Sequence, residues 1–339
     1  MGLIYDLSKK YETLSIVGMA KNAGKTTALN YLIEEADDEE LQLGITSTGR
    51  DGETVDLATG TDKPRVYLYE GTIVSVPTQL FDMAEASLEI VEMTTYGTAI
   101  GDLMICRVRE SGYVQIAGPV SAAETKRLSA DMLRLGCEMI LIDGAIDRKS
   151  VAEPETSDAV ILATGAVLSR NLKSVVDETS HIVNLYNLPE IEDKELADVV
   201  KENMIEKKVM IIDKKLNVEI LDLSTGLGAG RHIDEAISED TLCVFIPGAF
   251  TESVIADISP AKMKKIEFIL KDPTRIFIDV MRWRRYVKKG LRVKVIKNIK
   301  IAAVTVNPFS PSGYSFDRNA LIEAMRKQIP DIPIIDVRM

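Results

Sequence analysis

Cysteine and histidine are scarce in this chain of 339 residues. It contains three cysteines, Cys106, Cys137 and Cys243, and two histidines, His181 and His232. The cysteines are odd in number, widely spaced and without a Cys-x-x-Cys pair, which argues against a disulfide framework and against a structural zinc site. So few histidines argue equally against a His-based catalytic triad. This cysteine usage leads us to expect a protein of the reducing cytoplasm.

Long apolar runs are also missing. No stretch approaches the roughly 18 residues that a membrane-spanning helix needs. The first residues, Met-Gly-Leu-Ile-Tyr-Asp, lack the basic-then-apolar order of a secretory signal. We therefore expect no membrane partner and a cytoplasmic location.

Positive charge is in deficit, because 52 Asp and Glu stand against 41 Lys and Arg, a formal net charge of −11. Nucleic-acid phosphates repel such a surface, so we expect no nucleic-acid partner. Residues 282–300 are the exception, with nine basic side chains and no acidic one. This stripe is either a docking face for an acidic partner or a solvated helix face followed by a strand edge that resists aggregation. Its members are Arg282, Arg284, Arg285, Lys288, Lys289, Arg292, Lys294, Lys297 and Lys300.

Short runs rich in Val and Ile alternate with helical patterns along most of the chain. This alternation predicts an α/β fold with a mostly parallel sheet and helices on both faces. Four short runs between residues 72 and 117 predict a partly antiparallel insertion. The main expected strands are 13–18, 41–46, 139–143, 159–163, 181–186 and 300–306, and the main expected helices are 25–36, 121–135, 169–179, 280–288 and 317–327.

A charged stretch, residues 190–208, interrupts the apolar rhythm and is the expected domain boundary. We expect residues 1–195 to form a nucleotide-binding domain. Residues 205–339 are expected to form a C-terminal α/β domain, and one role for this domain is to bind a partner protein. This second domain is predicted to begin with a β-hairpin, because two apolar runs flank the turn Lys-Lys-Leu-Asn at 214–217.

A candidate phosphate-binding loop, or Walker A motif, lies between the first expected strand and helix, where residues 18–27 read Gly-Met-Ala-Lys-Asn-Ala-Gly-Lys-Thr-Thr. In such a loop, glycine lets the backbone approach the phosphates, and successive N–H groups at a helix N-terminus face the anion. Lys25 is predicted to reach the β- and γ-phosphates of ATP, and the Thr26 hydroxyl to ligate Mg²⁺. The predicted nucleotide-binding residues are Gly18, Lys21, Asn22, Ala23, Gly24, Lys25, Thr26 and Thr27.

The spacing of this loop departs from the strict motif. The first glycine is expected at position 19, where the chain has Met19, and Gly18 stands one residue earlier. The loop is therefore either one residue longer or able to turn without that glycine.

A matching acid follows the expected strand at 139–143. The segment Met-Ile-Leu-Ile-Asp-Gly-Ala ends the strand at Asp143. A rigid strand that carries one carboxylate to the phosphate end of the sheet is what a Mg²⁺ site requires. Asp143 is thus predicted to act on the metal, and together with Lys25 to take part in catalysis.

A polar loop follows the expected strand at 41–46. Residues 44–53 read Gly-Ile-Thr-Ser-Thr-Gly-Arg-Asp-Gly-Glu. Asp51 and Glu53 are predicted to hold Mg²⁺ or to orient an attacking water, although a simple polar turn explains the same pattern. No Asn-Lys-x-Asp guanine signature occurs, which favours ATP over GTP.

These pieces together resemble the dethiobiotin synthetase-like branch of P-loop proteins over roughly residues 13–190. The resemblance rests on residues 46–49 after the second strand, on Ile-Asp-Gly-Ala at 142–145 and on the strand and loop at 157–166. It implies a P-loop NTPase fold and Mg²⁺-dependent ATP chemistry.

Residues 18–27 with 46–53 are more closely similar to the P-loop subunit of lysine 5,6-aminomutase reactivases. That resemblance implies an ATPase subunit that works with a second reactivase subunit to renew the damaged cobalamin of an adenosylcobalamin-dependent aminomutase. Two alternatives stay open. One is a dethiobiotin synthetase-like enzyme that activates a carboxylate with ATP, and the other is a nucleotide-responsive binding module.

Overall fold

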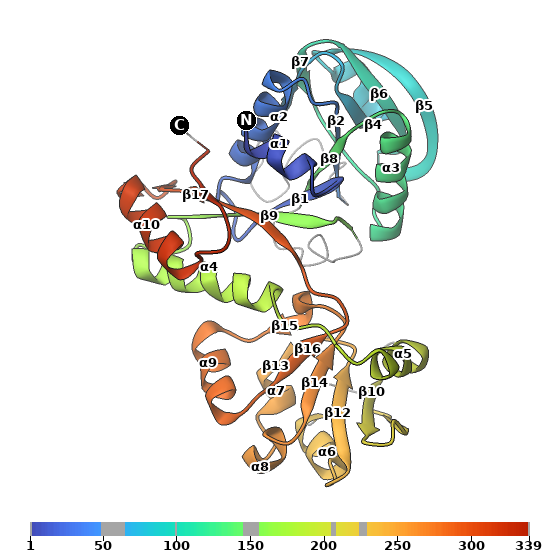
Figure 1. The fold of residues 1–339 in the computed structure, drawn as a ribbon. Coiled ribbons are helices and arrows are strands. Elements are labelled where there is room, and N and C mark those ends of the chain that lie inside the picture. The colour runs from blue at the N-terminus through green and yellow to red at the C-terminus, as the bar shows by residue number, and fades with distance from the viewer. Residues whose placement is uncertain are drawn as a thin grey trace. The chain divides into compact units, whose positions relative to one another are not determined.

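The computed structural model describes residues 2–48, 65–98, 100–144, 156–204, 208–223 and 229–337. The chain forms two compact units (Figure 1). One unit contains Met1–Ser180 together with Lys300–Met339, and the other contains His181–Ile299. Within the described ranges, no helix combines the length and the apolar character that crossing a membrane requires.

The first unit is built on a nine-stranded sheet with the strand order β20-β17-β9-β1-β8-β2-β4-β6-β5 in the described part of the chain. Neighbouring strands are parallel from β20 to β4. The last two, β6 and β5, are antiparallel, as the sequence predicts for this region. The strands are β1 (Thr13–Gly18), β2 (Leu43–Ser47), β4 (Ile73–Pro77), β5 (Ser87–Thr98), β6 (Gly101–Glu110), β8 (Met139–Asp143), β9 (Ala159–Gly165), β17 (Ile301–Asn307) and β20 (Ile334–Ile335).

Helices and short ribbons complete this unit. The helices are α1 (Leu3–Ser8), α2 (Lys25–Asp38), α3 (Ala122–Arg134), α4 (Leu172–Tyr186), which continues into the second unit, α10 (Arg318–Gln328) and the short 3-10 helix η1 (Thr78–Met83). Two antiparallel ribbons pair β3 (Val66–Leu68) with β7 (Gly112–Val114) and β18 (Phe309–Ser310) with β19 (Tyr314–Ser315).

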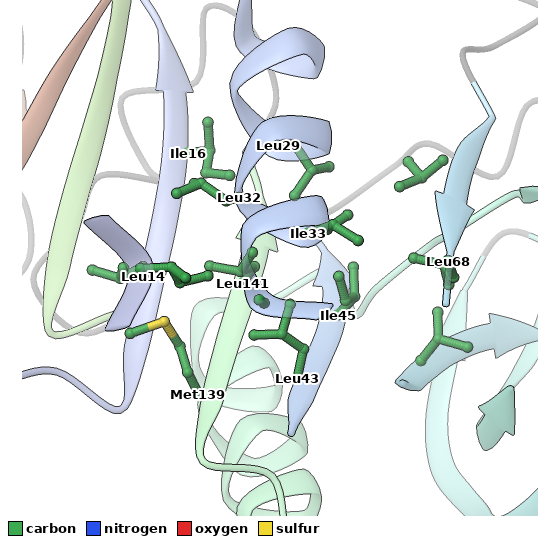
Figure 2. Packing of buried hydrophobic residues seen from close by; sticks show 14 of the residues in the cluster. Leu14, Ile16, Leu29, Leu32, Ile33, Leu43, Ile45, Leu68, Met139 and Leu141 are labelled. Atoms are coloured by element: carbon green, nitrogen blue, oxygen red, sulfur yellow. The ribbon is translucent and has the colours of Figure 1, made fainter. Parts of the chain in front are cut away.

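Both faces of the central sheet are covered, because successive side chains of a strand point to opposite faces. In β8, Met139 and Leu141 belong to the core that α2 covers (Figure 2). The residues between them, Ile140 and Ile142, belong to the core of α3 on the opposite face. Burial on both sides explains why β8 reads as an unbroken apolar run rather than as an alternating one.

The second unit is a smaller α/β unit in which the predicted hairpin follows α5. β10 and β11 pair antiparallel, and β12, β14 and β16 are parallel, in the order β11-β10-β12-β14-β16. Its elements are α5 (Lys194–Asn203), β10 (Val209–Asp213), β11 (Val218–Leu221), α6 (Ala229–Ala236), β12 (Thr241–Ile246), β13 (Phe250–Thr251), α7 (Glu252–Ile255), α8 (Pro260–Met263), β14 (Glu267–Leu270), η3 (Pro273–Arg275), β15 (Ile276–Phe277), α9 (Val280–Lys289) and β16 (Val293–Val295).

The predicted division into domains 1–195 and 205–339 differs from the structure. Residues 300–339 do not stay with the second unit, because β17 pairs in parallel with β9 and extends the sheet of the first. The charged stretch 190–208 is not a linker either. It contains α5, whose N-terminus is capped by the Asp193 carboxylate and whose Leu196 and Val200 are buried.

The strand predicted at 181–186 was wrong, because these residues form the last turns of α4. The run His-Ile-Val-Asn-Leu-Tyr is apolar enough for a strand when it is read alone. No glycine or proline separates it from the helical pattern before it, so the helix continues to Tyr186. A short apolar run does not distinguish a buried strand from a buried helix.

The three cysteines are buried free thiols. Burial raises the pKa of Cys106 to about 11 and the pKa of Cys137 and Cys243 to about 12. Because the thiolate is the reactive form, we expect all three to react with a thiol reagent at pH 8 at least about 100-fold more slowly in the folded protein than in denaturant. Spectrophotometric titration measures both rates, and one fast thiol in the folded protein would contradict this burial.

Candidate functional site

Five parallel strands bring their C-terminal ends to one edge of the large sheet. The order along this edge is β17, β9, β1, β8 and β2. The chain proceeds from β1 to β2 on one side, whereas β9 lies on the other side of β1, so the strand order reverses at β1. In open α/β sheets, ligands bind at the carboxyl ends of the strands next to such a reversal. The predicted phosphate loop, residues 18–27, leaves β1 at this point.

The β1–α2 loop, residues 19–24, turns at two residues with positive φ. Asn22 has a φ of 65° and Gly24 a φ of 98°. Glycine is required at the second position, because a side chain there would be strained and its Cβ would lie 3.1 Å from the Cβ of Asn307. Met19 is not among the residues with positive φ, so the loop turns without a glycine at that position.

The N-terminus of α2 has no side-chain cap. Its N-cap is Gly24, which has no side chain to accept a hydrogen bond from the first turn. By contrast, Ser121 caps α3 and Asp317 caps α10 through their side chains. The first N–H groups of a helix have no acceptor within it, and their dipoles point towards a negative charge. An uncapped N-terminus of a long helix is therefore a suitable place for a phosphate.

The structure brings Lys25 and Asp143 together. The Lys25 Nζ atom lies 2.5 Å from Oδ1 of Asp143 and also donates a hydrogen bond to the carbonyl oxygen of Gly144. Both side chains are largely buried, with 13% of Lys25 and 24% of Asp143 exposed. An ion pair this far from bulk water is weakly screened. The contact therefore holds the ammonium group at the sheet edge, beside the first turn of α2.

The remaining predicted residues of the loop differ in burial. Thr26 and Thr27 are half-buried in the first turn of α2, Ala23 is buried, and Lys21 and Asn22 are exposed. Exposure leaves the last two side chains accessible to a ligand in solvent. The predicted residues Asp51 and Glu53 lie outside the described residues.

The end of β2 is attached to Asp143 through the backbone. The Ser47 hydroxyl and the Thr48 N–H both donate to the Asp143 carbonyl oxygen, each at 3.1 Å. The Thr48 hydroxyl is buried and has no hydrogen-bond partner within the described ranges. Gly118 packs against the same strand end, since a Cβ there would lie 1.6 Å from the Ser47 carbonyl oxygen.

Sequence reasoning missed Asn307, the last residue of β17. Its side-chain amide donates to the carbonyl oxygen of Asn22 at 3.4 Å and accepts a hydrogen bond from the Phe309 N–H at 3.1 Å. Its own carbonyl oxygen leaves no room for a Cβ at Gly165. A polar residue at the end of an apolar strand was the available signal. The sequence does not show that this strand joins the sheet beside the loop.

No protein-family model, no curated protein and no solved structure matches this chain. The class that the fold defines is an α/β protein with a large mixed, mostly parallel sheet. Its candidate site is defined by geometry alone. An uncapped helix N-terminus, a lysine and a carboxylate meet at the edge where the strand order reverses.

The close packing at Gly118 gives a stability prediction. We expect Gly118→Ala to lower the free energy of unfolding by about 3 kcal/mol, because two backbone segments must separate to admit the methyl group. Gly97→Ala is the matched control, since no atom lies within 4 Å of a Cβ built there. We expect it to change stability by less than about 0.5 kcal/mol. Urea unfolding measures both, and equal stabilities of the two variants would contradict the packing.

Proposed function

We propose that this chain is a P-loop NTPase that binds ATP and Mg²⁺ at the β1–α2 loop. The observation that carries the proposal is the contact between Lys25, at the start of α2, and Asp143, at the end of the neighbouring strand β8. A flexible cation at a helix N-terminus suits an oligophosphate. A carboxylate on the adjacent parallel strand suits the metal that accompanies it.

The residues at this edge fit a nucleotide triphosphate. The uncapped N–H groups of α2 and the Lys25 ammonium would face the phosphate oxygens. Gly24 has no side chain that would obstruct the phosphates, and its left-handed backbone turns the loop into the helix. The N–H donors are fixed by the strand-to-helix connection, whereas Lys25 would exchange its contacts with Asp143 and Gly144 for contacts with the phosphates.

The Thr26 hydroxyl and the Asp143 carboxylate would hold Mg²⁺. This ion takes few ligands from proteins, usually one or two carboxylates beside water and phosphate oxygens. ATP, when bound, supplies the phosphoryl group whose transfer releases free energy. The chain positions that group through Lys25 and orders the metal through Asp143, whose backbone is fixed by Ser47 and Thr48.

On the sequence resemblance, we further propose that this ATPase is a subunit of a reactivating factor for an adenosylcobalamin-dependent aminomutase. Such a role needs a nucleotide site and a surface for partners rather than a substrate pocket. Support comes from the sequence motifs at 18–27 and 46–53, and from a second α/β unit available for contacts with a partner. The partners would be the aminomutase and a second reactivase subunit.

The nucleotide site is tested by Lys25→Ala. We expect ATP affinity in the presence of Mg²⁺ to fall by at least about 100-fold, because the phosphates lose the positive charge that Lys25 provides at the start of α2. Isothermal titration calorimetry measures the affinity, and thermal melting checks that the variant folds. Lys173→Ala, which removes an exposed lysine from α4, is the control and should bind ATP like the wild type.

In the same assay, Asp143→Asn tests the contribution of the metal independently of the contribution of the phosphate contacts. It keeps the shape of the side chain and removes its charge, so we expect the gain in affinity that Mg²⁺ provides to shrink while binding without metal is retained. Wild-type ATP affinity in Lys25→Ala would refute the nucleotide site. An unchanged Mg²⁺ effect in Asp143→Asn would refute only the metal assignment.

The reactivase role is tested by turnover. We expect slow ATP hydrolysis by the isolated chain and an increase of at least about tenfold when an adenosylcobalamin-dependent aminomutase and the second subunit are added. Phosphate release measures both rates, and Lys25→Ala in the full mixture gives the background. Fast turnover by the chain alone with a small carboxylic acid would instead support the carboxylate-activating alternative.

A further inference from the structure

Helix α9 presents a face that mixes apolar and basic side chains. Met281, Arg284 and Lys288 lie at the spacing i, i+3 and i+7, so they share one side of the helix. Met281 is 74% exposed and Val287 47% exposed. Phe277, just before the helix, is 55% exposed. Protein interfaces are enriched in aromatic residues, Met and Arg, and this combination is found on and beside α9.

The other side of α9 is anchored within its own unit. Tyr286 is buried, and its hydroxyl lies 3.2 Å from a carboxylate oxygen of Glu252. The same carboxylate binds Arg282 at 2.5 Å and Arg285 at 2.9 Å. Glu252 therefore offsets part of the charge on this side. The side with Arg284 and Lys288 is held in a fixed orientation by these contacts.

The first unit carries a surface of the opposite character. Glu34, Asp37 and Asp38 lie at i, i+3 and i+4 near the end of α2, and all three are exposed. Tyr67 and Tyr113, on the β3–β7 ribbon, are 37% and 45% exposed, and their ring centroids lie 5.2 Å apart. We call these five residues the acidic–tyrosine surface.

The acids and the ribbon are close together, because α2 packs beside β3. The ring of Tyr69 lies 5.3 Å from that of Tyr67. Burial raises the pKa of Tyr69, and the negative charges of Glu34 and Asp37 raise it further. The pKa of Asp37 is itself raised, first by burial and then by the neighbouring Asp38. A cation placed here would relieve the repulsion among these groups.

We propose that the basic face of α9 docks on the acidic–tyrosine surface of a second copy of this chain. Arg284 and Lys288 are four residues apart on one helix, and Glu34 and Asp38 are four residues apart on the other. Arginine also stacks on tyrosine rings, which adds to the attraction between charges. Each copy carries both surfaces, so the contact joins unlike faces of two copies. This inference is independent of nucleotide binding.

Charge reversal tests the contact. The first variant is Arg284→Glu with Lys288→Glu, and the second is Asp37→Lys with Asp38→Lys. Sedimentation velocity at about 0.15 M salt is suitable, because charges beyond about 8 Å are then screened and the overall negative charge matters little. We expect the wild type to associate and each variant alone to associate at least about tenfold more weakly. An equimolar mixture of the two variants should recover association, because the reversed surfaces match again.

The matched control is Lys194→Glu with Lys201→Glu, which makes the same change of charge on exposed residues of α5 in the same unit. It should associate like the wild type, and thermal melting and calorimetry with ATP should be unchanged for all variants. A monomeric wild type at about 100 μM would overturn the proposal, as would a mixture that recovers nothing. A wild type that stays monomeric but binds phosphatidylserine vesicles through α9 would overturn it in favour of a membrane surface.

Discussion

The parallel backbone ladder that places β1 between β8 and β9 is the constraint on which the candidate site depends. Its hydrogen bonds set Ile16 opposite Asp143 on one side and Gly18 opposite Ala163 on the other. The register leaves little freedom, because α2 and α3 bury both faces of this sheet and a slip by one residue would turn every apolar side chain to the wrong face. The side chains of Lys25 and Asp143 are therefore held at the carboxyl edge by a core to which they do not belong (Figure 2).

This buried core supports two unfavourable features at the carboxyl edge of the sheet, a largely buried ion pair and an uncapped helix N-terminus. Lys25 and Asp143 form a largely buried ion pair, whose desolvation is unfavourable unless further hydrogen bonds compensate it. The Gly144 carbonyl accepts one of these bonds from Lys25, and Ser47 and Thr48 fix the backbone of Asp143. The N-terminus of α2 lacks the side-chain cap that α3, α5, α9 and α10 have. The proposed nucleotide site rests on this uncapped helix N-terminus and on the ion pair beside it.

The two units divide the surface properties of the chain between them. Acidic and tyrosine side chains gather at the end of α2 and on the β3–β7 ribbon, whereas the basic side chains of α9 belong to the second unit. An overall charge of −11 hides this division. The structure shows this division through the contacts of α9. Glu252 binds Arg282 and Arg285 on one side of the helix, and this contact orients the other basic residues of the helix.

The sequence by itself determined the elements whose signals are local. Ser121, Asp279 and Asp317 precede helical patterns and cap α3, α9 and α10, and the unbroken apolar run before Asp143 predicted β8 with its observed bounds. It also predicted that Asp143 would lie at the same edge of the sheet as the candidate phosphate-binding loop, because the carboxyl ends of parallel strands meet there. The α/β class followed from the alternation of strands and helices.

Tertiary structure alone decided what depends on contacts between distant residues. The run at 181–186 is helical because it continues α4, and nothing within the six residues distinguishes that outcome. Asn307 reaches the loop across 285 positions of sequence because β17 returns to pair with β9. Local sequence patterns specify an element and the face that it buries. The order of the strands depends on which strands pair with each other in the folded sheet, and no local pattern contains that information. For the same reason, the sequence placed residues 300–339 in the wrong unit.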